Sequence, residues 1–364
     1  MFPFHTGYPI FLTWCGSASI YFGIWQVKYM ATIKDVAQRA GLGTGTVSRV
    51  LNGSGYVSDE SRQKVLDAVR DLNYVPNAQA RAMMTRRTMT LGVALPDLTN
   101  PYFPGMVRGI EDEARRNGYT VILLETDWQP ANERLAIDIL RRQSVDGTIL
   151  VDVTLSDLLT NILITANVPV VLIGRGVERQ DVSEITVNNY KGATEAMQWI
   201  FSKGHRRIGF LAGPTHAASA KQRLRAYLDF MGWEAIRVDE LEKHPELPIA
   251  QTDYSFEKGR QATELLFQKH PDITCIFGVN DMTALGALSH LTARSISVPD
   301  TLAVVGFDDI LMASLVHPPL TTMHQPVYDM GVAGARLLIE RIKNAECEIQ
   351  RLVFDPVLVV RQSC

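Results

Sequence analysis

The stretch from residue 31 to residue 75 carries apolar residues at helical spacing. An apolar stripe starts at Ile33 and recurs three, four and seven residues later, which predicts an amphipathic helix. Thr32 can cap the start of this helix, and Asp35, three residues later, can accept a hydrogen bond from the Thr32 backbone in return. Gly41 can end the helix in a left-handed turn. The pattern therefore predicts a short first helix between a capping pair and a glycine.

Two more helices are predicted after it, over residues 44–52 and 58–73. Each has one apolar side, and the rest of its surface is polar. The side chains expected to face inward are Val47, Val50 and Leu51 in the second helix and Val65, Leu66, Val69 and Leu72 in the third. Three short helices with a shared inner side predict a helix-turn-helix domain.

The outer face of the second helix carries small or hydrogen-bonding side chains. A helix with a packed back and a thin polar front fits a major groove, where an arginine can bind the edge of a guanine through two hydrogen bonds. We therefore expect double-stranded DNA as a partner and Arg49 as a base-reading residue. The other residues within reach of bases or phosphates are Thr44, Ser48 and Asn52.

Three glycines between residues 41 and 45 invite comparison with a dinucleotide-binding loop. Thr46 stands where the third glycine of that motif belongs, and the preceding element is predicted to be a helix rather than a strand. We therefore interpret these glycines as part of the helix-turn-helix domain.

Charge is distributed unevenly along the chain. The formal net charge is −3, yet residues 31–90 carry nine Lys or Arg against five Asp or Glu. A basic N-terminal module on an acidic body fits a polyanion bound at one end. The four cysteines are far apart and form no Cys-x-x-Cys pair, which disfavours a zinc site and a disulfide framework and suits a reducing cytosol.

The first thirty residues do not fit this pattern. Residues 1–27 include no Lys, Arg, Asp or Glu and are rich in aromatic residues. A membrane or signal segment is one interpretation, although its start lacks the basic region of a secretory signal and Gly16 interrupts the apolar run. The other interpretation is that Met30 is the natural start, and we treat residues 1–30 as an extension outside the fold.

From residue 91 onward the pattern changes to short apolar runs separated by helical stretches. The runs expected to form strands are 91–95, 120–124, 147–151, 170–173, 208–212, 275–277 and 302–305. This alternation predicts parallel, doubly wound α/β sheets, and seven strands or more favour two lobes over one sheet. Ligands of such folds bind beyond the carboxyl ends of the strands, so a cleft between the lobes is the expected site.

Polar and aromatic side chains stand where these strands end. Arg223 and Asp308 can supply a charged pair, while nearby amides, hydroxyls and rings can bind hydroxyl groups and cover C–H surfaces. Together they suit a polyhydroxylated ligand, although each residue alone also fits a helix cap or a surface ion pair. The candidates are Tyr102, Phe103, Ser219, Arg223, Tyr254, Asn280 and Asp308.

Three N-terminal motifs resemble the signature of the lac repressor family. They are Thr32-Ile-Lys-Asp-Val-Ala, Thr46-Val-Ser-Arg-Val-Leu-Asn-Gly53 and Asn73-Tyr-Val-Pro76, and the resemblance covers essentially residues 31–363. It implies a helix-turn-helix DNA-binding domain at 31–75, a hinge helix and linker at 76–88, and a two-lobed periplasmic-binding-protein-like domain at 89–364. The two lobes are expected to be parallel, doubly wound α/β sheets.

The resemblance also implies roles in DNA binding. Thr44, Gly45 and Arg49 fall where the family reads bases, and Gly45 removes one reading side chain. Gly43 stands where the family usually has serine, so the side-chain cap of the recognition helix is missing. Met83 replaces the hinge leucine that wedges into a minor-groove step. Backbone-contacting or helix-positioning places are taken by Ile33, Gly43, Thr46, Ser48, Asn52, Ser58, Ser61, Tyr74 and Asn77.

The same resemblance implies an effector site. Ala217 stands where the purine-binding member of the family has an arginine, which disfavours a nucleobase and leaves a sugar or a sugar acid. Arg175 and Asn188 resemble further pocket positions. The residues that match effector-contacting positions are Tyr102, Phe103, Ser219, Arg223, Asn280 and Asp308.

The implied function is a cytoplasmic transcriptional regulator, most often a repressor, that works as a homodimer. The chain shows no C-terminal leucine heptad for a tetramer, and two turns of hinge helix should order only when paired on DNA. We expect neither a cofactor nor a metal nor a membrane partner. A periplasmic-type sugar-binding protein shares the two lobes but not the DNA-binding module, and the motifs of an enzyme are not recognised.

Overall fold

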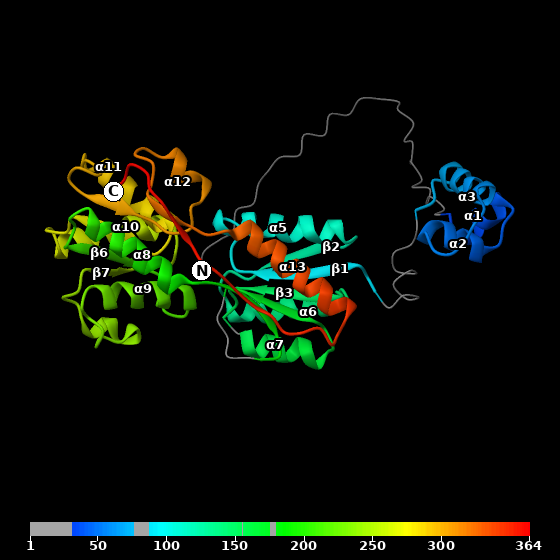
Figure 1. Cartoon of the computed structure of the whole chain (residues 1–364), viewed down its shortest axis with the longest axis horizontal. Helices are drawn as coiled ribbons and strands as arrows, with labels where there is room; N and C mark the ends of the chain where they lie inside the picture. Colours follow the sequence, from blue (N-terminus) through cyan, green and yellow to red (C-terminus); the bar gives the residue numbers. More distant parts are fainter. Residues whose placement is uncertain (1–30, 76–86, 155, 175–179) are drawn as a thin grey trace, which may run out of the picture. The chain divides into compact units, whose positions relative to one another are not determined.

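The computed structural model describes residues 31–75, 87–154, 156–174 and 180–364 (Figure 1). The chain divides into two compact units, Met1–Ala78 and Gln79–Cys364, which we describe separately. The first unit contains the three N-terminal helices, and the second contains both lobes of the α/β body.

The N-terminal unit is the predicted three-helix domain, with α1 (Ile33–Ala40), α2 (Thr44–Asn52) and α3 (Asp59–Asp71). The capping pair at its start is confirmed, since Thr32 Oγ1 accepts a hydrogen bond from the Asp35 N–H and the Asp35 carboxylate accepts one from the Thr32 N–H. Gly41 ends α1 with a φ of 66°, in the left-handed region. The core of this unit lies between the helices.

One inward-facing residue was wrongly predicted. Leu66 is 42% exposed, whereas Val65 and Ala68 are buried. The face of α3 that packs on α1 repeats at i and i+3 from Val65, so Leu66 points about a quarter turn away from the core. The periodicity predicted the helix correctly but included Leu66 in the buried face, where it does not belong.

The N-terminal lobe is built on a six-stranded parallel sheet in the order β11-β5-β4-β3-β1-β2. Two helix layers cover it: α5 and α13 pack together on one face, and α6 and α7 cover the other (Figure 1). The elements are β1 (Thr90–Leu95), α5 (Tyr102–Arg116), β2 (Thr120–Glu125), α6 (Pro130–Arg142), β3 (Gly147–Val151), α7 (Ser156–Thr165), β4 (Val170–Ile173), β5 (Ser183–Val187), α13 (Val327–Lys343) and β11 (Arg351–Phe354).

The C-terminal lobe contains a four-stranded parallel sheet in the order β7-β6-β8-β9 and an antiparallel pair, β10 with β12. Helices α8 and α9 lie on one side of the sheet, and α10 and α11 lie on the other. The elements are α8 (Asn189–Ser202), β6 (Ile208–Ala212), α9 (Ala218–Phe230), the 3₁₀ helix η1 (Val238–Lys243), β7 (Ile249–Gln251), α10 (Phe256–Lys269), β8 (Cys275–Gly278), α11 (Asp281–Ala293), β9 (Ala303–Val305), α12 (Leu311–Leu315), β10 (Thr322–His324) and β12 (Val357–Val359).

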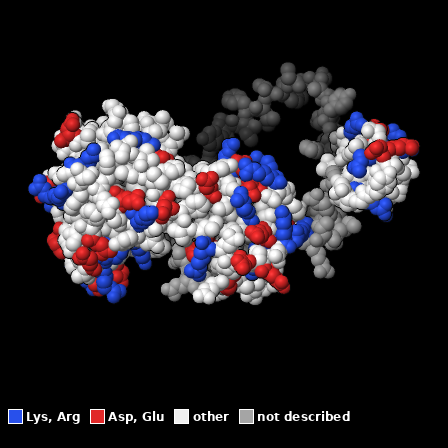
Figure 2. All heavy atoms as spheres, in the orientation of Figure 1, with Lys and Arg blue, Asp and Glu red and all other residues white. Residues whose placement is uncertain are grey.

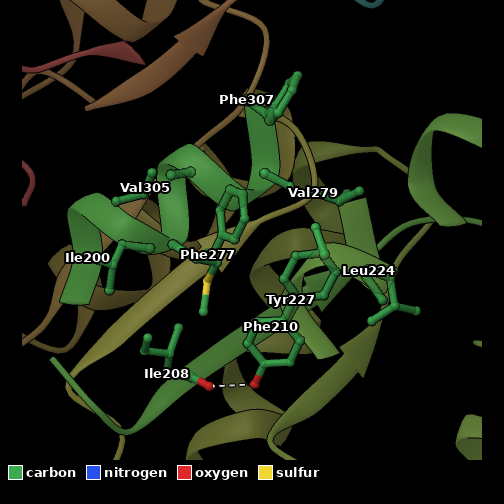
Figure 3. Close-up of a cluster of buried hydrophobic side chains, with 14 of the residues drawn as sticks. Ile200, Ile208, Phe210, Leu224, Tyr227, Phe277, Val279, Val305 and Phe307 are labelled. Atoms are coloured by element: carbon green, nitrogen blue, oxygen red, sulfur yellow. Dashed lines mark hydrogen bonds between the residues drawn. The ribbon is translucent and has the colours of Figure 1, made fainter. Parts of the chain in front are cut away.

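Aromatic rings fill much of the core between this sheet and its α8–α9 layer (Figure 3). Phe210 on β6 stacks on Tyr227 of α9 with ring centroids 4.8 Å apart and meets Phe277 of β8 edge-on at 5.4 Å. The Tyr227 hydroxyl donates to the Ile208 carbonyl at 2.7 Å, so its polar end is satisfied. This rigid layer supports α9, which carries two of the candidate site residues.

The chain passes between the lobes three times. It crosses after β5 into α8, after β10 into α13, and after β11 into β12. Gln325 lies on the second crossing, and Asn189 begins α8 directly after the first. Side chains on these crossings therefore sit beside any cleft that the two lobes enclose.

The predicted two-lobed parallel architecture is confirmed, and each of the seven predicted strands is present with ends within one residue. Five further strands of the described chain were missed: β5, β7, β10, β11 and β12. They are short. In β5 the polar residues Ser183, Glu184 and Thr186 interrupt the apolar run that would identify a buried strand. Its burial comes from neighbours β4 and β11, which the local sequence does not show.

Candidate DNA-binding face and ligand cavity

Within the N-terminal unit, the outer face of α2 is exposed. Thr44, Gly45, Arg49 and Asn52 are exposed, whereas Val47 and Val50 on the opposite side are buried. Asn52 Nδ2 donates to Ser48 Oγ at 3.1 Å, and Thr46, like Ser48, is half-buried. The helix therefore presents the thin polar front that a major groove requires.

Basic and acidic side chains both lie on the surface of this unit (Figure 2), and several of them form ion pairs. Arg39 pairs with Asp71, Lys64 with Glu60, and Arg70 with Asp67. Arg49 forms no ion pair with any of the described residues. Its guanidinium is thus available for a base or a phosphate, which distinguishes it from Arg39 and Arg70.

The start of α2 lacks a side-chain cap. Gly43 is the N-cap residue, and an added Cβ there would meet nothing within 4 Å. The same holds for Gly45 inside the helix. Neither glycine is required by packing, so the absence of their side chains shapes the surface that α2 presents.

Two more residues flank this face. Tyr74 is half-buried against the core of the unit, and its N–H donates to the Val69 carbonyl at 3.0 Å. Tyr56, in the loop between α2 and α3, is 91% exposed and was not singled out by the sequence. An isolated tyrosine in a glycine-rich loop carries no periodic signal. The candidate residues Asn77 and Met83 lie outside the described residues.

The linker joins the N-terminal lobe through Asp146. One carboxylate oxygen accepts from the Thr88 N–H at 2.7 Å and from the Thr88 hydroxyl at 2.9 Å, and the other accepts from the Met89 N–H at 3.0 Å. Arg87 donates to the Ile342 carbonyl at 3.0 Å. The described end of the linker is therefore tied to the lobe just before β1.

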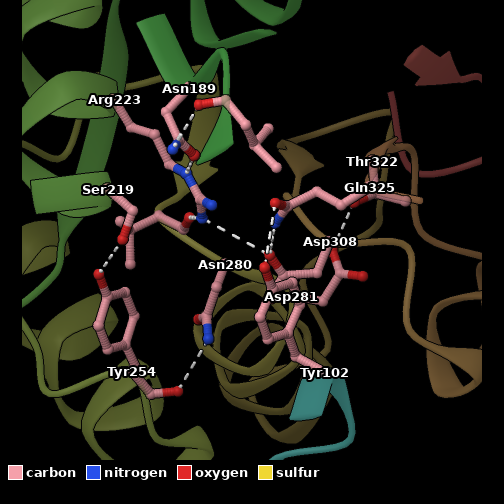
Figure 4. Close-up of polar contacts among 12 residues, drawn as sticks. Tyr102, Asn189, Ser219, Arg223, Tyr254, Asn280, Asp281, Asp308, Thr322 and Gln325 are labelled. Atoms are coloured by element: carbon pink, nitrogen blue, oxygen red, sulfur yellow. Dashed lines mark hydrogen bonds and ion pairs between the residues drawn. The ribbon is translucent and has the colours of Figure 1, made fainter. Parts of the chain in front are cut away.

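A cavity lies between the two lobes and encloses about 460 Å³ of space, counting the open space at its mouth. Its walls come from both lobes and from the crossings between them (Figure 4). The lining residues are Asn100, Tyr102, Phe103, Trp128, Asp152, Gly174, Val187, Asn189, Ser219, Arg223, Tyr254, Asn280, Asp308 and Gln325. Carboxylates, amides, hydroxyls and rings thus converge on one space.

Arg223 is the buried cation of this cavity, with 4% of its surface exposed. Its Nε donates to Asn189 Oδ1 at 2.9 Å, and its Nη1 donates to the Val279 carbonyl at 2.6 Å. Nη1 lies 3.6 Å from Asp308 Oδ1, and the guanidinium covers the Phe307 ring at 3.7 Å from the centroid. These contacts hold the guanidinium in one orientation, as a buried charge requires.

Asp308 faces Arg223 across the cavity wall and is buried as well. Gln325 Nε2 donates to its Oδ1 at 2.6 Å, and Gln325 Oε1 accepts from the Tyr102 hydroxyl at 3.4 Å. Burial raises the pKa of Asp308 to about 8, although Arg223 and the hydrogen bond from Gln325 pull it down. Gln325 therefore links a carboxyl of the C-terminal lobe to a tyrosine of the N-terminal lobe.

A second buried carboxyl supports the Asp308 loop from behind. The Asp281 side chain accepts hydrogen bonds from the Ile310 N–H and from the Thr322 hydroxyl. Burial raises its pKa to about 6, against the effect of those two hydrogen bonds. Asp281 does not line the cavity but holds the segment that presents Asp308.

A chain of hydrogen bonds forms the opposite wall. Ser219 Oγ and the Tyr254 hydroxyl lie 3.0 Å apart, and Asn280 Nδ2 donates to the Tyr254 carbonyl at 3.2 Å. Asn280 also caps α11 through Thr283. The wall thus consists of groups that both donate and accept, which suits ligand hydroxyls.

Aromatic rings close the cavity on the side of the N-terminal lobe. Tyr102 and Phe103 meet edge-on with centroids 5.1 Å apart. Trp128, from the loop between β2 and α6, lies 6.4 Å from Phe103 and 5.8 Å from Tyr254 of the other lobe. Ring faces of this kind cover the C–H surfaces of a sugar.

Several lining residues have a backbone conformation that side chains rarely adopt. Trp128, Asp152, Tyr254 and Asp308 have φ values of 57°, 45°, 71° and 131°. Each such residue costs on the order of 1–3 kcal/mol and persists only where the surrounding structure enforces it. Positive φ at four positions around one cavity indicates that function, rather than stability, shapes these loops.

These contacts place most of the candidate effector residues together. Tyr102, Phe103, Ser219, Arg223, Tyr254, Asn280 and Asp308 all line the cavity. Tyr102 and Phe103 form the first turn of α5, and Arg223 lies within α9. Because a helix starts soon after the strand, residues of the first helical turn, and not only loop residues, reach the cavity.

One candidate points elsewhere, and several lining residues were missed. The Asn188 side chain accepts from the Lys191 N–H at the start of α8, and its neighbour Asn189 lines the cavity instead. Arg175 lies outside the described residues. Trp128 and Asp152 follow the ends of buried strands, which is the same sequence signal that identified Asn280. Gln325 had no such signal, because it lies on a crossing between the lobes.

No helix of the described ranges is long and apolar enough to cross a membrane. The same residues contain no cluster of three or more His, Cys, Asp or Glu that could hold a metal ion.

Comparison with known proteins agrees with both units. Residues 32–77 match the bacterial regulatory proteins of the lacI family, and residues 198–364 match the periplasmic binding protein-like domain. The ribose operon repressor of Halalkalibacterium halodurans is 34% identical over 92% of this chain and 97% of its own length. The chain belongs to the lacI family of bacterial regulators. It is a DNA-binding transcriptional regulator, and members of this family are not enzymes.

Other lacI-family relatives differ in what their names specify. The transcriptional repressor PurR of Mannheimia succiniciproducens is 32% identical over 92% of this chain and 98% of its own length. Sugar-related and purine-related repressors are thus similarly related to this chain. Overall similarity leaves the effector undetermined, so the cavity itself must be considered.

Solved structures of lacI-family regulators share the fold. A complex of the regulator CelR with cellobiose is 34% identical, covers 92% of this chain and 100% of its own, and has a TM-score of 0.68. The structure of the lac repressor dimer bound to operator and the anti-inducer ONPF is 27% identical in sequence and has a TM-score of 0.79. The match covers 92% of this chain and 99% of the lac repressor chain. Homologues therefore bind operator DNA as dimers and bind sugar effectors.

Proposed function

We propose that this protein is a cytoplasmic repressor of carbohydrate-metabolism genes that works as a homodimer. In this proposal the exposed face of α2 enters the major groove of an operator, with Thr44, Gly45 and Arg49 at the bases. A small sugar or sugar acid binds in the cavity between the lobes and changes the affinity for that operator. The dimeric operator complex of the lac repressor supports the assembly.

The observation that carries the effector class is the chemistry of the cavity wall. Arg223 and Asp308 can form charge-assisted hydrogen bonds, Ser219 and Asn280 add groups that both donate and accept, and aromatic rings surround them. Sugars present hydroxyls at their edges and C–H groups on their faces, which matches this arrangement. The cellobiose complex of CelR supports the same class.

Ala217 argues against a nucleobase. It lies 8% exposed at the start of α9, next to Ser219, and its methyl group cannot hydrogen-bond to a ring nitrogen or carbonyl. A site that recognises a base through a long basic side chain would lose that contact here. We therefore place the effector among the saccharides although PurR repressors are close relatives.

A binding screen on the full-length protein tests this function. An operator is first selected from a random pool of duplex DNA, and fluorescence anisotropy then measures binding to it with sugars, sugar acids and purine bases. We expect a saccharide to change the operator affinity by about tenfold or more, since allosteric couplings are typically about 1–3 kcal/mol. A response to a purine base alone would overturn the effector class, and no selected operator would overturn the DNA-binding role.

A further inference from the structure

Two cysteines that are far apart in the sequence lie together in the C-terminal lobe. Cys275 is the first residue of β8 and is fully buried. Cys364 is half-buried and packs against the hydrophobic cluster that contains Cys275. The Cys275 thiol and the Cys364 sulfur form a hydrogen bond. Two sulfur atoms in contact can be joined by a disulfide without a large movement of the backbone.

Hydrogen bonds at the preceding residue hold Cys364 in this place. The Val304 N–H donates to the Ser363 carbonyl at 2.7 Å, and the Ser363 hydroxyl donates to the Val304 carbonyl at 2.6 Å. Val304 follows Ala303, which is the β9 residue paired with Cys275 in the sheet. The segment after β12 is therefore tied to the strand next to β8, and its position does not depend on the contact between the two sulfur atoms.

The two sulfur atoms have different surroundings. Burial raises the pKa of the Cys275 thiol, and its hydrogen bond to Cys364 adds to this effect. The same hydrogen bond lowers the pKa of Cys364 against the effect of burial, and the charge of Lys203 and the indole N–H of Trp199 lower it further. Cys364 is thus the sulfur that ionises first, while Cys275 retains its proton.

Trp199 and Lys203 come from α8 and its C-terminal end, and they form one group beside Cys364. Lys203 Nζ lies 4.3 Å from the centre of the Trp199 ring. Trp199 Nε1 is buried and has no other hydrogen-bond partner among the described residues. A buried N–H without a partner is costly, so an anionic sulfur beside it is stabilised.

We propose that Cys364 is a peroxide-reactive thiol and that Cys275 resolves it, so that hydroperoxides convert the pair into a disulfide. Redox-sensing cysteines are typically accessible thiolates that lie next to a second thiol. The disulfide fixes the segment that follows the third crossing covalently to β8. This site is separate from the ligand cavity and from α2, so the inference does not depend on the identity of the effector.

The chemistry needs one equivalent of hydroperoxide. The Cys364 thiolate attacks a peroxide oxygen, so that an S–O bond forms and the O–O bond breaks, and the departing hydroxide takes a proton from solvent. The Cys275 sulfur then attacks the sulfenic acid, so that the S–S bond forms and the S–O bond breaks. The second hydroxide takes the proton of Cys275 and leaves as water. The peroxide gains the two electrons that the two thiols lose.

Peroxide titration of the reduced, full-length protein tests this proposal. Hydrogen peroxide is added without other thiols present, and differential alkylation with mass spectrometry follows each cysteine. We expect Cys364 to be oxidised about tenfold or more faster than Cys347, which is half-buried as well but follows α13 in the N-terminal lobe. Peptide mapping under non-reducing conditions should recover a peptide pair that joins Cys275 to Cys364, and dithiothreitol should reverse the link.

Three cysteine variants separate the two roles. Cys275→Ala should leave Cys364 reactive but stop it at the sulfenic acid, which dimedone traps. Cys364→Ser should protect Cys275 from oxidation, because Cys275 is fully buried. The matched control is Cys347→Ser, which should form the disulfide at the rate of the wild type. Melting temperatures of the reduced proteins show whether each variant is folded, and should Cys275→Ala fail to fold, Cys364→Ser still decides.

Lysine variants test the positioning role of Lys203. Lys203→Gln should slow the oxidation of Cys364 severalfold, and Lys203→Arg, which retains the charge, should restore the rate. Lys258→Gln is the control, since Lys258 is an exposed lysine on α10, on the other side of the sheet. Oxidation of Cys364 no faster than that of Cys347 would overturn the proposal, as would oxidised Cys364 in a wild-type protein whose Cys275 stays a free thiol.

Discussion

The helix-turn-helix unit and the ligand cavity place their functional side chains in opposite ways. The candidate DNA-reading residues lie within nine consecutive residues of α2, on an exposed face. The cavity gathers residues between Asn100 and Gln325 from both lobes, and its central Arg223 is almost fully buried. A local amphipathic pattern suffices for the first, whereas the second exists only after the sheets have formed and the lobes have met.

The two arginines illustrate what this difference means energetically. Arg49 is solvated and has no ion pair among the described residues, so it contributes binding energy only when DNA is bound. Arg223 has already lost its hydration and depends on Asn189, Val279 and Asp308. The same type of side chain thus adds little to stability in one unit and stabilises the packed structure of the other.

Replacing the buried arginine should have the largest effect. Arg223→Met leaves Asn189 Oδ1 and the Val279 carbonyl without their donor and removes the cation beside the Asp308 carboxyl, so we expect the free energy of unfolding to fall by about 3 kcal/mol. Saccharide binding should be lost as well. Chemical denaturation and calorimetry measure both.

The control for Arg223→Met is Arg294→Met. Arg294 forms an exposed ion pair with Glu264, whose loss should cost less than about 1 kcal/mol. If the two variants were equally stable, the buried cluster would not support the second unit in the way described.

Replacing the exposed arginine should change recognition and leave stability alone. Arg49→Ala is expected to weaken operator binding by about 1–3 kcal/mol and to weaken binding to random DNA much less, because a bidentate base contact is lost. Arg70→Ala on α3, whose side chain already pairs with Asp67, is the matched control. Equal losses on operator and random DNA, measured by anisotropy, would exclude base reading by Arg49.

The buried carboxyl should make the second unit sensitive to pH. Burial raises the pKa of Asp308 to about 8, so the folded protein retains a proton that the unfolded chain releases near pH 4. The resulting stabilisation is present below about pH 4 and is lost as the pH rises towards 8, by at most about 1.4 kcal/mol per pH unit. Asp281, with a pKa raised to about 6, acts in the same direction.

Asp308→Asn tests that dependence. Denaturation at pH 5, 6, 7 and 8 should show a smaller fall in stability for this variant than for the wild type. Glu257→Gln serves as the control, since Glu257 is fully exposed and its pKa is lowered by Arg260 to about 2, outside this range. Parallel curves for wild type and Asp308→Asn would show that the carboxyl does not titrate as described.

The smallest effect should come from the missing cap on α2. Gly43→Ser adds a side chain where a Cβ meets nothing within 4 Å, and it should stabilise α2 by a few tenths of a kcal/mol. Amide hydrogen exchange of α2 in the full-length protein measures this gain. Gly45→Ser, inside the same helix, should not reproduce it; equal protection in both variants would argue against capping.

Much of the first unit could be predicted from sequence, because each helix carries its own boundaries. Thr32 and Asp35 start α1 and Gly41 ends it, and the structure places them in these roles. Leu66 was the exception, since it is apolar but points away from α1. Which of two neighbouring apolar residues is buried depends on the partner helix and not on the stripe alone.

The cavity could be predicted only in part. Asn280 and Asp308 were found because a polar residue after a buried strand marks the carboxyl edge of a sheet. Gln325 and Asn189 were not found, because they lie where the chain crosses between lobes, and the sequence has no local signal for such crossings. Asn188 and Asn189 differ by one residue, and only the turn into α8 decides which of them faces the cavity.

The sequence by itself determined the helices of the N-terminal unit, the alternation of strands and helices in the body, and the polar residues at the strand ends. These features follow from periodicity, capping and turn preferences, which act over a few residues. Only the tertiary structure decided that Trp128, Asp152 and Gln325 join the candidates and that Asp308 is buried with a raised pKa. Burial, electrostatics and cavity shape depend on segments far apart in the chain, and these come together only when both sheets are packed and the three crossings bring the lobes face to face.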